Sequence, residues 1–272
     1  MNELIFDMDE DKYFSHPAIS NSKLKPLEKS GAHFLAALDE PSKTTSAQFM
    51  GKLIHTSVLE PKKLKERYEF ADRKLDGRKK EDKEYKASVI ASGRELVAID
   101  DAMKVAQITG KVQLHEGASK LLFDLEGSAE VSAFWTDEET GVECKGRFDY
   151  LTDSGFIVDL KTTGDADEEN FKRTIANFKY YRQAAMYIDA YQTIKKQACK
   201  GFIIVAVEKE SPYEVACYRI NDTAIEQGRR EYKALLRTYK ACKDSDDFKG
   251  YSPLIEDVGL PLWALDEDLR NE

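Results

Sequence analysis

The sequence predicts an α/β fold in which a mixed central β-sheet is flanked by helices. Apolar residues have helical spacing over most of residues 20–122, and the spacing changes to a period of two between residues 129 and 162. A long helical stretch, two further strand patterns and a last helical pattern follow. This order of elements is typical of a single α/β domain with a mixed sheet.

The helices are expected from their start and stop signals. Ser20-Asn21-Ser22 resembles a helix start, and Pro41 and Pro61 end helical patterns. Asp165-x-x-Glu168 resembles a capping box with Asp in place of Ser or Thr. The expected helices cover residues 23–38, 45–59, 85–122, 165–195 and 223–243.

The strands are expected where apolar and polar residues alternate. Thr152-Asp153-Ser154-Gly155 is a turn signal that joins the second and third strands. The expected strands cover residues 129–135, 142–150, 156–162, 201–208 and 214–220.

Length and composition indicate one ordinary domain. The chain has 272 residues, of which 42% are hydrophobic and 33% charged. We expect a helical part at 1–125, a core at 126–245 and an acidic tail at 246–272. No apolar run has the length of a membrane span, and the acidic N-terminus does not resemble a signal peptide. A cytoplasmic location is therefore expected.

The four cysteines indicate no local metal cluster. None of them belongs to a C-x-x-C pair, so neither a zinc ribbon nor an iron–sulfur cluster is expected. Few cysteines without a disulfide framework fit a reducing compartment. The cysteines are Cys144, Cys199, Cys217 and Cys242.

The net charge of −9 would at first argue against a nucleic-acid partner. The two ends of the chain account for it, however, with −4 in residues 1–10 and −5 in residues 254–272. Residues 62–86 hold eleven Lys and Arg against seven Asp and Glu, a local surplus of four. A locally basic surface can bind a phosphate backbone whatever the total charge.

The central chemical signal lies in two neighbouring strand patterns. Asp149 ends Arg147-Phe148-Asp149, and Asp159 and Lys161 follow two apolar residues in the next strand. Residues two apart on a strand face the same side, so the carboxylate and the ammonium share a face. A tight turn would place Asp149 opposite or diagonal to Asp159. Two carboxylates and one amine would then meet at the edge of the sheet.

Such a patch suits phosphodiester cleavage. Two carboxylates can hold Mg²⁺, and the main-chain carbonyl of Leu160 is a plausible further ligand. A metal ion lowers the pKa of bound water and polarises a phosphate. Lys161 can orient the attacking water or stabilise the charge that develops in the transition state. On these residues alone, a surface hairpin with an ordinary Asp–Lys ion pair stays open as the alternative.

Two helices carry further candidates. Gln183 and Tyr187 are four apart and lie on one helical face, from which they could hydrogen-bond a phosphate or a base. Tyr180 is on the neighbouring turn. His55 lies at the border of an apolar helix face, one turn after Gly51. The alternatives are a core Tyr187, a solvated Gln183 and a structural His55.

Taken together, these segments resemble the exodeoxyribonuclease VIII family of prophage recombination systems, which belongs to the PD-(D/E)XK nucleases. The resemblance spans nearly the whole chain, in the same order. The matching segments are Ile19-Ser20-Asn21-Ser22-Lys23-Leu24-Lys25, Gly51-x-x-x-His55-x-x-x-Leu59-Glu60-Pro61, Arg147-Phe148-Asp149, Val158-Asp159-Leu160-Lys161-Thr162-Thr163, Tyr180-x-x-Gln183-Ala184-Ala185-x-Tyr187 and Leu260-Pro261-Leu262-Trp263.

The resemblance implies a restriction-endonuclease-like core and a magnesium-dependent exonuclease, with Mn²⁺ as a substitute metal. It implies degradation of linear double-stranded DNA, 5′ to 3′, which leaves 3′ single strands for a single-strand annealing recombinase. Some relatives assemble as homo-oligomeric rings around DNA. By resemblance, the metal ligands are His55, Asp149, Asp159 and the Leu160 carbonyl. Lys161 matches the catalytic lysine, and Gln183 and Tyr187 match the motif on the following helix.

The chain also departs from the family pattern. The segment that begins at Arg78 resembles an Arg-Thr-x-x-Gly-Lys segment, but Lys79 and Asp82 replace its Thr and Gly. Arg78 and Arg147 are candidate DNA contacts, and a solvated loop is the alternative for Arg78. The long N-terminal region of the best-known member has no counterpart here. An endonuclease or nickase of the same fold and an inactive DNA-binding recombination accessory protein stay open as other functions.

Overall fold

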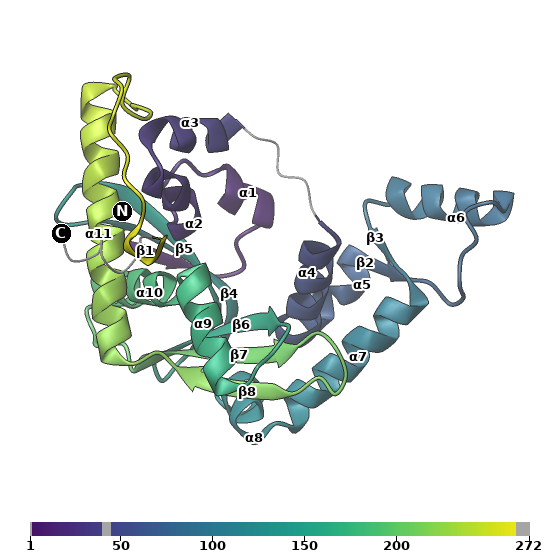
Figure 1. Cartoon of the computed structure of the whole chain (residues 1–272). Helices are drawn as coiled ribbons and strands as arrows, with labels where there is room; N and C mark the ends of the chain where they lie inside the picture. Colours follow the sequence, from purple (N-terminus) through teal and green to yellow (C-terminus); the bar gives the residue numbers. More distant parts are fainter. Residues whose placement is uncertain (1, 40–44, 265–272) are drawn as a thin grey trace.

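Six strands form the central sheet, in the order β1-β4-β5-β6-β7-β8 (Figure 1). The computed structural model of the chain describes residues 2–39 and 45–264, so Pro41 and the end of the acidic tail lie outside it. β6 and β7 are parallel and the other neighbours antiparallel, which confirms a mixed sheet. The strands are β1 (Glu3–Ile5), β4 (Gly127–Thr136), β5 (Glu143–Thr152), β6 (Phe156–Thr163), β7 (Gly201–Glu208) and β8 (Val215–Arg219).

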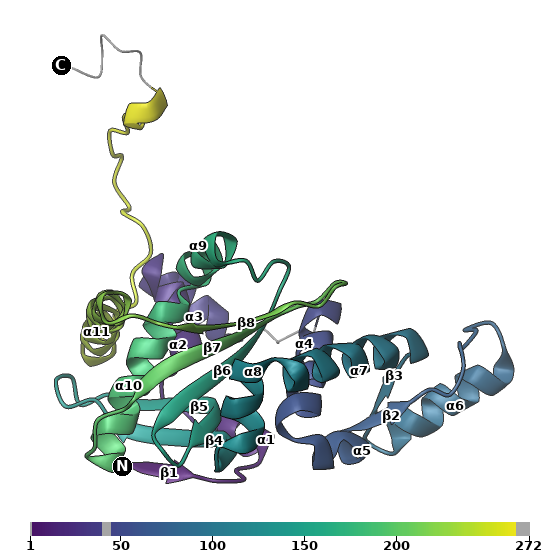
Figure 2. The same cartoon turned by 90° about the horizontal axis from the view of Figure 1, so that it is seen from below.

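Helices cover both faces of this sheet (Figure 2). On one face, α10 (Tyr180–Lys195) and α11 (Asp222–Ser245) close a core in which Ala184 and Ala185 are fully buried. On the other face, α4 (Ser46–Leu59) and α7 (Ile99–Leu114) pack a second core against β6 and β7. The small side chains of α10 allow the helix to approach the strands closely. The predicted α/β architecture is therefore confirmed.

The parallel pair β6–β7 requires a long crossover, which α9 (Glu168–Phe178) and α10 provide. The single helix predicted over 165–195 is wrong, because Lys179 adopts a left-handed conformation with φ of 59° and separates the two helices. The predicted capping box is wrong as well. Asp167 caps α9, and its carboxylate accepts the backbone N–H of Glu169 at 3.0 Å.

The N-terminal part is not purely helical, because β1 pairs with β4 at the edge of the sheet. Short elements follow it instead of one helix over 23–38. Pro26 lies in the first turn of a 3-10 helix that divides the predicted helix. The elements are α1 (Glu10–Ser15), α2 (Asn21–Leu24), η1 (Lys25–Glu28) and α3 (Gly31–Asp39).

Residues 68–97 form an arm that projects away from the central sheet (Figures 1 and 2). Two short parallel strands, β2 (Tyr68–Phe70) and β3 (Glu95–Val97), form its base, and α6 (Lys80–Ala91) lies between them in the chain. The helix predicted over 85–122 is therefore divided. The remaining elements are η2 (Pro61–Lys63), α5 (Leu64–Arg67), α8 (Glu116–Ser119), η3 (Lys120–Asp124) and η4 (Leu262–Ala264).

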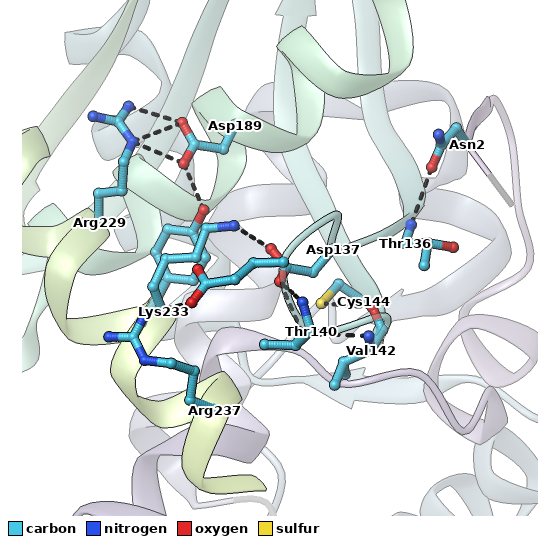
Figure 3. Close-up of polar contacts among 12 residues, drawn as sticks. Asn2, Thr136, Asp137, Thr140, Val142, Cys144, Asp189, Arg229, Lys233 and Arg237 are labelled. Atoms are coloured by element: carbon cyan, nitrogen blue, oxygen red, sulfur yellow. Dashed lines mark hydrogen bonds and ion pairs between the residues drawn. The ribbon is translucent and has the colours of Figure 1, made fainter. Parts of the chain in front are cut away.

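Two polar clusters fasten α11 to the rest of the domain (Figure 3). Asp137, which is 3% exposed, pairs with Lys233 of α11 and accepts the Thr140 hydroxyl at 2.8 Å. On α10, Asp189 binds the Arg229 guanidinium through both carboxylate oxygens, at 2.8 and 2.9 Å. These pairs fix α11 against the β4–β5 connection and against α10. Within the part of the chain that the structure describes, no helix is long and apolar enough to span a bilayer.

Candidate active site

β5 and β6 separate at the point where the candidate carboxylates lie. Their backbones pair only at Tyr150–Val158 and Leu151–Ile157. Continuing this register would place Asp149 opposite Asp159, but the ladder ends before that pair. The Oδ2 atom of Asp149 instead accepts the backbone N–H of Leu160 at 2.8 Å. A side chain therefore replaces the backbone partner, and the two strands open beside both acids.

The regular alternation of β5 reverses at Asp149. Phe148 packs in the core under α10, whereas Tyr150 packs against the core under α4. Residues two apart in a regular strand would face the same side, so Asp149 interrupts the pleat. The neighbouring strand is irregular at the same level, because Glu130 has a φ of 52°. This double irregularity lets Asp149 and Glu130 reach the gap beside β6.

Asp159 and Lys161 share a face, as their spacing predicted. Asp159 is 1% exposed, and its Oδ2 atom lies 2.6 Å from Lys161 Nζ. Its Oδ1 atom accepts a hydrogen bond from Gln183 Nε2 of α10 at 2.9 Å. The buried carboxylate is thus held between an ammonium on its own strand and an amide on the covering helix.

His55 reaches the same place from the opposite face of the sheet. Its Nδ1 atom lies 3.6 Å from Asp149 Oδ2. A possible metal-binding group forms here: each of His55, Glu130 and Asp149 offers one ligand atom, and these three atoms lie within 4.8 Å of one another. The sequence does not indicate Glu130, because a regular strand over 129–135 does not predict its left-handed backbone. The ladder pairs on either side, Ala129–Tyr150 and Val131–Phe148, place Glu130 opposite Asp149, but this register is seen only in the structure.

The electrostatics of the cluster fit a divalent cation. Burial, with a further contribution from Asp149, raises the pKa of Asp159 to about 6 although the Lys161 ammonium lowers it. Burial and the Asp149 carboxylate raise the pKa of Glu130 to about 8. Buried carboxylates that oppose one another's ionisation gain most from a cation between them. The imidazole of His55 and the carboxylates of Glu130 and Asp149 are chemically suited to such an ion. Asp159 is not part of this group of ligand atoms among the described residues, because its two oxygens face Lys161 and Gln183.

Gln183 and Tyr187 face inward, which differs from the expected contact with DNA. Gln183 holds Asp159, and Tyr187 is 9% exposed. The Tyr187 hydroxyl accepts the backbone N–H of Arg147 at 3.4 Å, and its ring packs on Phe148 with centroids 5.1 Å apart. A side chain at position 146 would collide with this ring, so Gly146 provides the space. Both residues therefore support the carboxylate-bearing strands from behind.

The two candidate DNA contacts lie in different settings. The guanidinium of Arg147 donates to Ser132 Oγ at 3.0 Å and to the Met8 carbonyl at 3.1 Å, and it lies over the ring of Tyr13. Arg147 thus fastens the N-terminal segment, and its guanidinium is engaged by groups of the protein itself. Arg78 is exposed in the arm, and its side chain makes no hydrogen bond or ion pair among the described residues.

The fold and this set of side chains define a nuclease of the PD-(D/E)XK class. More particularly, the chain belongs to the family described as PDDEXK-like domain of unknown function (DUF3799), whose pattern matches residues 20–257. A mixed sheet flanked by helices is a restriction-endonuclease-like fold, as predicted. The candidate residues lie between its two central strands, β5 and β6, and not at the edge of the sheet as expected.

Among solved structures, the chain is similar to the crystal structure of a "Putative exonuclease" from Eubacterium rectale. The TM-score is 0.61 at 14% identity, over 87% of this chain and 88% of the other, which shows a shared fold. A second structure, of SSO0001, has a TM-score of 0.30 at 14% identity, over 83% and 86% of the two chains. No curated protein matches the chain.

Proposed function

We propose that the protein is a metal-dependent exodeoxyribonuclease that degrades linear double-stranded DNA from its ends. The observation that carries this proposal is the meeting of Asp149, Asp159 and Lys161 where β5 and β6 separate. A partly buried lysine beside two carboxylates is an arrangement that suits phosphodiester hydrolysis. The family and the similar structure support a nuclease.

His55, Asp149, Asp159 and the Leu160 carbonyl are the proposed metal ligands, and Glu130 is a further candidate. The bound ion would be Mg²⁺, with Mn²⁺ as a substitute, since oxygen ligands dominate the set. Such an ion supplies charge neutralisation at the phosphate and lowers the pKa of water. No cysteine belongs to the set, so no iron–sulfur cluster is proposed.

The protein's own groups would do the rest. The Lys161 ammonium, 19% exposed in its side chain, can donate to a phosphate oxygen and stabilise the charge that grows there in the transition state. Gln183 keeps the Asp159 carboxylate in one rotamer. Because these groups are fixed before substrate arrives, little reorganisation is needed during the reaction.

The arm is the proposed place for contact with the duplex backbone outside the active site. It carries Arg78, whose guanidinium is available to a phosphate, and part of the basic segment 62–86. Backbone contacts of this kind are independent of base sequence and weaken steeply with salt. Nonspecific binding along a duplex is what an exonuclease requires.

The finer features of the proposal rest on the resemblance to exodeoxyribonuclease VIII. They are 5′-to-3′ polarity, release of 3′ single strands to a single-strand annealing recombinase, and a homo-oligomeric assembly such as a ring. The motifs that support them run in the same order along nearly the whole chain.

The test is digestion of linear duplex DNA that carries a label at either the 5′ or the 3′ end, with closed circular DNA as a parallel substrate. We expect Mg²⁺-dependent shortening of the linear DNA, early release of the 5′ label and intact circles. Cleavage of circles would instead indicate an endonuclease or nickase. DNA binding without any cleavage or metal uptake, measured by calorimetry, would indicate an accessory protein and overturn the proposal.

A further inference from the structure

An exposed aromatic side chain lies at the corner between α9 and α10. The large apolar residues of α9 form one stripe, Phe171, Ile175 and Phe178, at helical spacing. Phe171 is 1% exposed and Ile175 packs against the main core, whereas Phe178 is 58% exposed. The stripe therefore continues past the edge of the core and ends in an aromatic ring in solvent.

This ring is connected to the active site through one other aromatic residue. Phe178 stacks on Tyr180, with ring centroids 5.6 Å apart and planes 15° from parallel. The ring of Tyr180 in turn lies 5.1 Å from Lys161 Nζ. Two stacked rings thus lead from solvent to the ammonium that the proposed function places on the scissile phosphate.

The corner that carries the two rings is held in place. Lys179 between them adopts φ of 59°, a conformation that non-glycine residues adopt infrequently. Its Nζ atom lies 2.9 Å from the Tyr181 hydroxyl and 3.6 Å from Glu231 of α11. Because the lysine is fastened to α11, the rings on either side of it keep one geometry.

We propose that Phe178 and Tyr180 form a stacking platform for an unpaired nucleobase of the DNA strand being cleaved, on the nucleotide next to the scissile phosphate. This inference rests on the proposed function and adds a substrate contact to it. Bases inside a duplex present no free face, so only a terminal or frayed base can stack on a protein ring. A platform beside the catalytic amine therefore suits a substrate that enters by its end.

Stacking would be tolerant of sequence, because every base has a π-face. It would also hold the strand end while the phosphate meets Lys161, which should improve both binding and positioning. An alternative role for Phe178 is purely structural, as an apolar contact that closes the helix corner. The two roles differ in whether the base itself matters.

The experiment combines protein variants with a missing base. Wild type, Phe178→Ala, Phe178→Leu and Phe178→Trp are assayed on labelled linear duplexes that carry either a normal or a tetrahydrofuran abasic nucleotide on each side of the first scissile phosphate. Phe123→Ala is the matched control, since Phe123 is a 41% exposed phenylalanine in η3. Circular dichroism and thermal unfolding check that each variant is folded.

We expect Phe178→Ala to lower kcat/KM on normal ends by roughly tenfold, since a stacked base is worth about this factor or more. Phe178→Trp should keep the activity, and Phe178→Leu should lose nearly as much as Ala. Removing the base should lower the kcat/KM of wild type by a similar factor but leave the kcat/KM of Phe178→Ala almost unchanged. The platform would be overturned if the abasic nucleotide lowered kcat/KM by the same factor in wild type and in Phe178→Ala. Full activity of Phe178→Leu on normal ends would overturn it as well.

A second readout does not depend on cleavage. 2-Aminopurine placed at the strand end should change its fluorescence when wild type binds in Ca²⁺, and this change should be lost in Phe178→Ala at saturating protein. The same fluorescence change in wild type and Phe178→Ala, or no change in wild type, would contradict the platform while leaving the nuclease proposal intact. Absence of DNA cleavage by wild type, by contrast, would remove the proposed function and this inference together.

Discussion

The Oδ2 atom of Asp149 accepts the backbone N–H of Leu160 at 2.8 Å, across the gap where β5 and β6 stop pairing. In a strand, the N–H and C=O of one residue point toward the same neighbouring strand. The Leu160 carbonyl therefore also faces β5, the side on which Asp149 and His55 lie. One hydrogen bond thus spans the gap between the strands and fixes the Asp149 carboxylate beside the Leu160 backbone.

This relationship predicts different outcomes for two substitutions of Asp149. Asn keeps an oxygen that can accept the Leu160 N–H but removes a charge from a crowded cluster. Without metal, Asp149→Asn should be at least as stable as wild type. Asp149→Ala should lose about 1–2 kcal/mol in free energy of unfolding, because the hydrogen bond is lost. Urea unfolding in EDTA gives the measurement.

Both variants should nevertheless be inactive, because neither supplies a carboxylate to the metal. Calorimetric titration with Mn²⁺ should show a large loss of affinity in each. A metal-free Asp149→Asn protein that is less stable than Asp149→Ala would show that the contact with Leu160 is not what holds this carboxylate.

Gln183 is predicted to be a positioning residue that acts through Asp159. Because its amide holds Oδ1 of the buried carboxylate, Gln183→Ala should lower kcat by roughly 10–100-fold, a range typical for residues that support a metal ligand. The KM for DNA should change little, since Gln183 faces the carboxylate. Initial rates over a range of DNA concentrations separate the two parameters.

The acidic counterpart is the informative control. Gln183→Glu cannot donate a hydrogen bond to Asp159 and adds a like charge, so it should be less active than Gln183→Ala. Equal kcat values for wild type and Gln183→Ala would exclude the positioning role.

Glu130 is predicted to strengthen metal binding. It lies with His55 and Asp149 in one group of ligand atoms, and burial together with the Asp149 carboxylate raises its pKa, so a cation beside it would favour its ionised form. Glu130→Gln keeps the shape and removes the charge. It should weaken Mn²⁺ binding by roughly tenfold or more, and a high metal concentration should restore most of the activity. Activity measured against metal concentration provides the readout.

If the activity of Glu130→Gln depended on metal concentration as in wild type, Glu130 would have a structural role and would not contribute to metal binding. Glu60→Gln is a useful comparison, since Glu60 is also acidic and near the cluster but is paired with Lys63 and Arg67. It should leave the metal dependence close to that of wild type.

The parts of this site that follow strand periodicity could be predicted from sequence. Asp159 and Lys161 are two apart in one strand, so a common face follows from the pleat alone. Asp149 was predicted near them from the short connection between the strands. Gln183 and Tyr187 were placed correctly on one helical face, but the direction of that face depends on how α10 packs, which periodicity does not report.

The parts of the site that depend on local backbone irregularity could not be predicted from sequence. Glu130 reaches the cluster because its own backbone is left-handed within a strand. This conformation favours Gly or Asn, so a Glu at the position gives no signal of it. The break at Lys179, which displays Phe178 and Tyr180, has no Gly or Pro either. The arm was not predicted, because β2 and β3 pair across 24 residues of intervening chain and such pairing leaves no local pattern. A single helix was predicted over 85–122 instead.

Lys233 is predicted to stabilise the fold through Asp137, and with a definite pH dependence. Burial raises the pKa of Asp137, but the Lys233 ammonium and the Thr140 hydroxyl outweigh this and bring it below its ordinary value of 3.8. A carboxylate with a lowered pKa in the folded state stabilises the protein above its unfolded pKa. Asp137→Asn should therefore reduce the free energy of unfolding by about 1–2 kcal/mol at pH 7, a value discounted because Lys233 is partly exposed.

This difference should persist as the pH falls to about 4 and then shrink, because wild-type Asp137 itself becomes protonated there. Urea unfolding of both proteins between pH 7 and pH 3 measures it. Lys233→Met should be more destabilising than the double variant with Asp137→Asn, since the single change leaves a buried carboxylate without its cation. A difference between wild type and Asp137→Asn that stays constant below pH 4 would show that the carboxylate contributes through packing and hydrogen bonds and not through its charge.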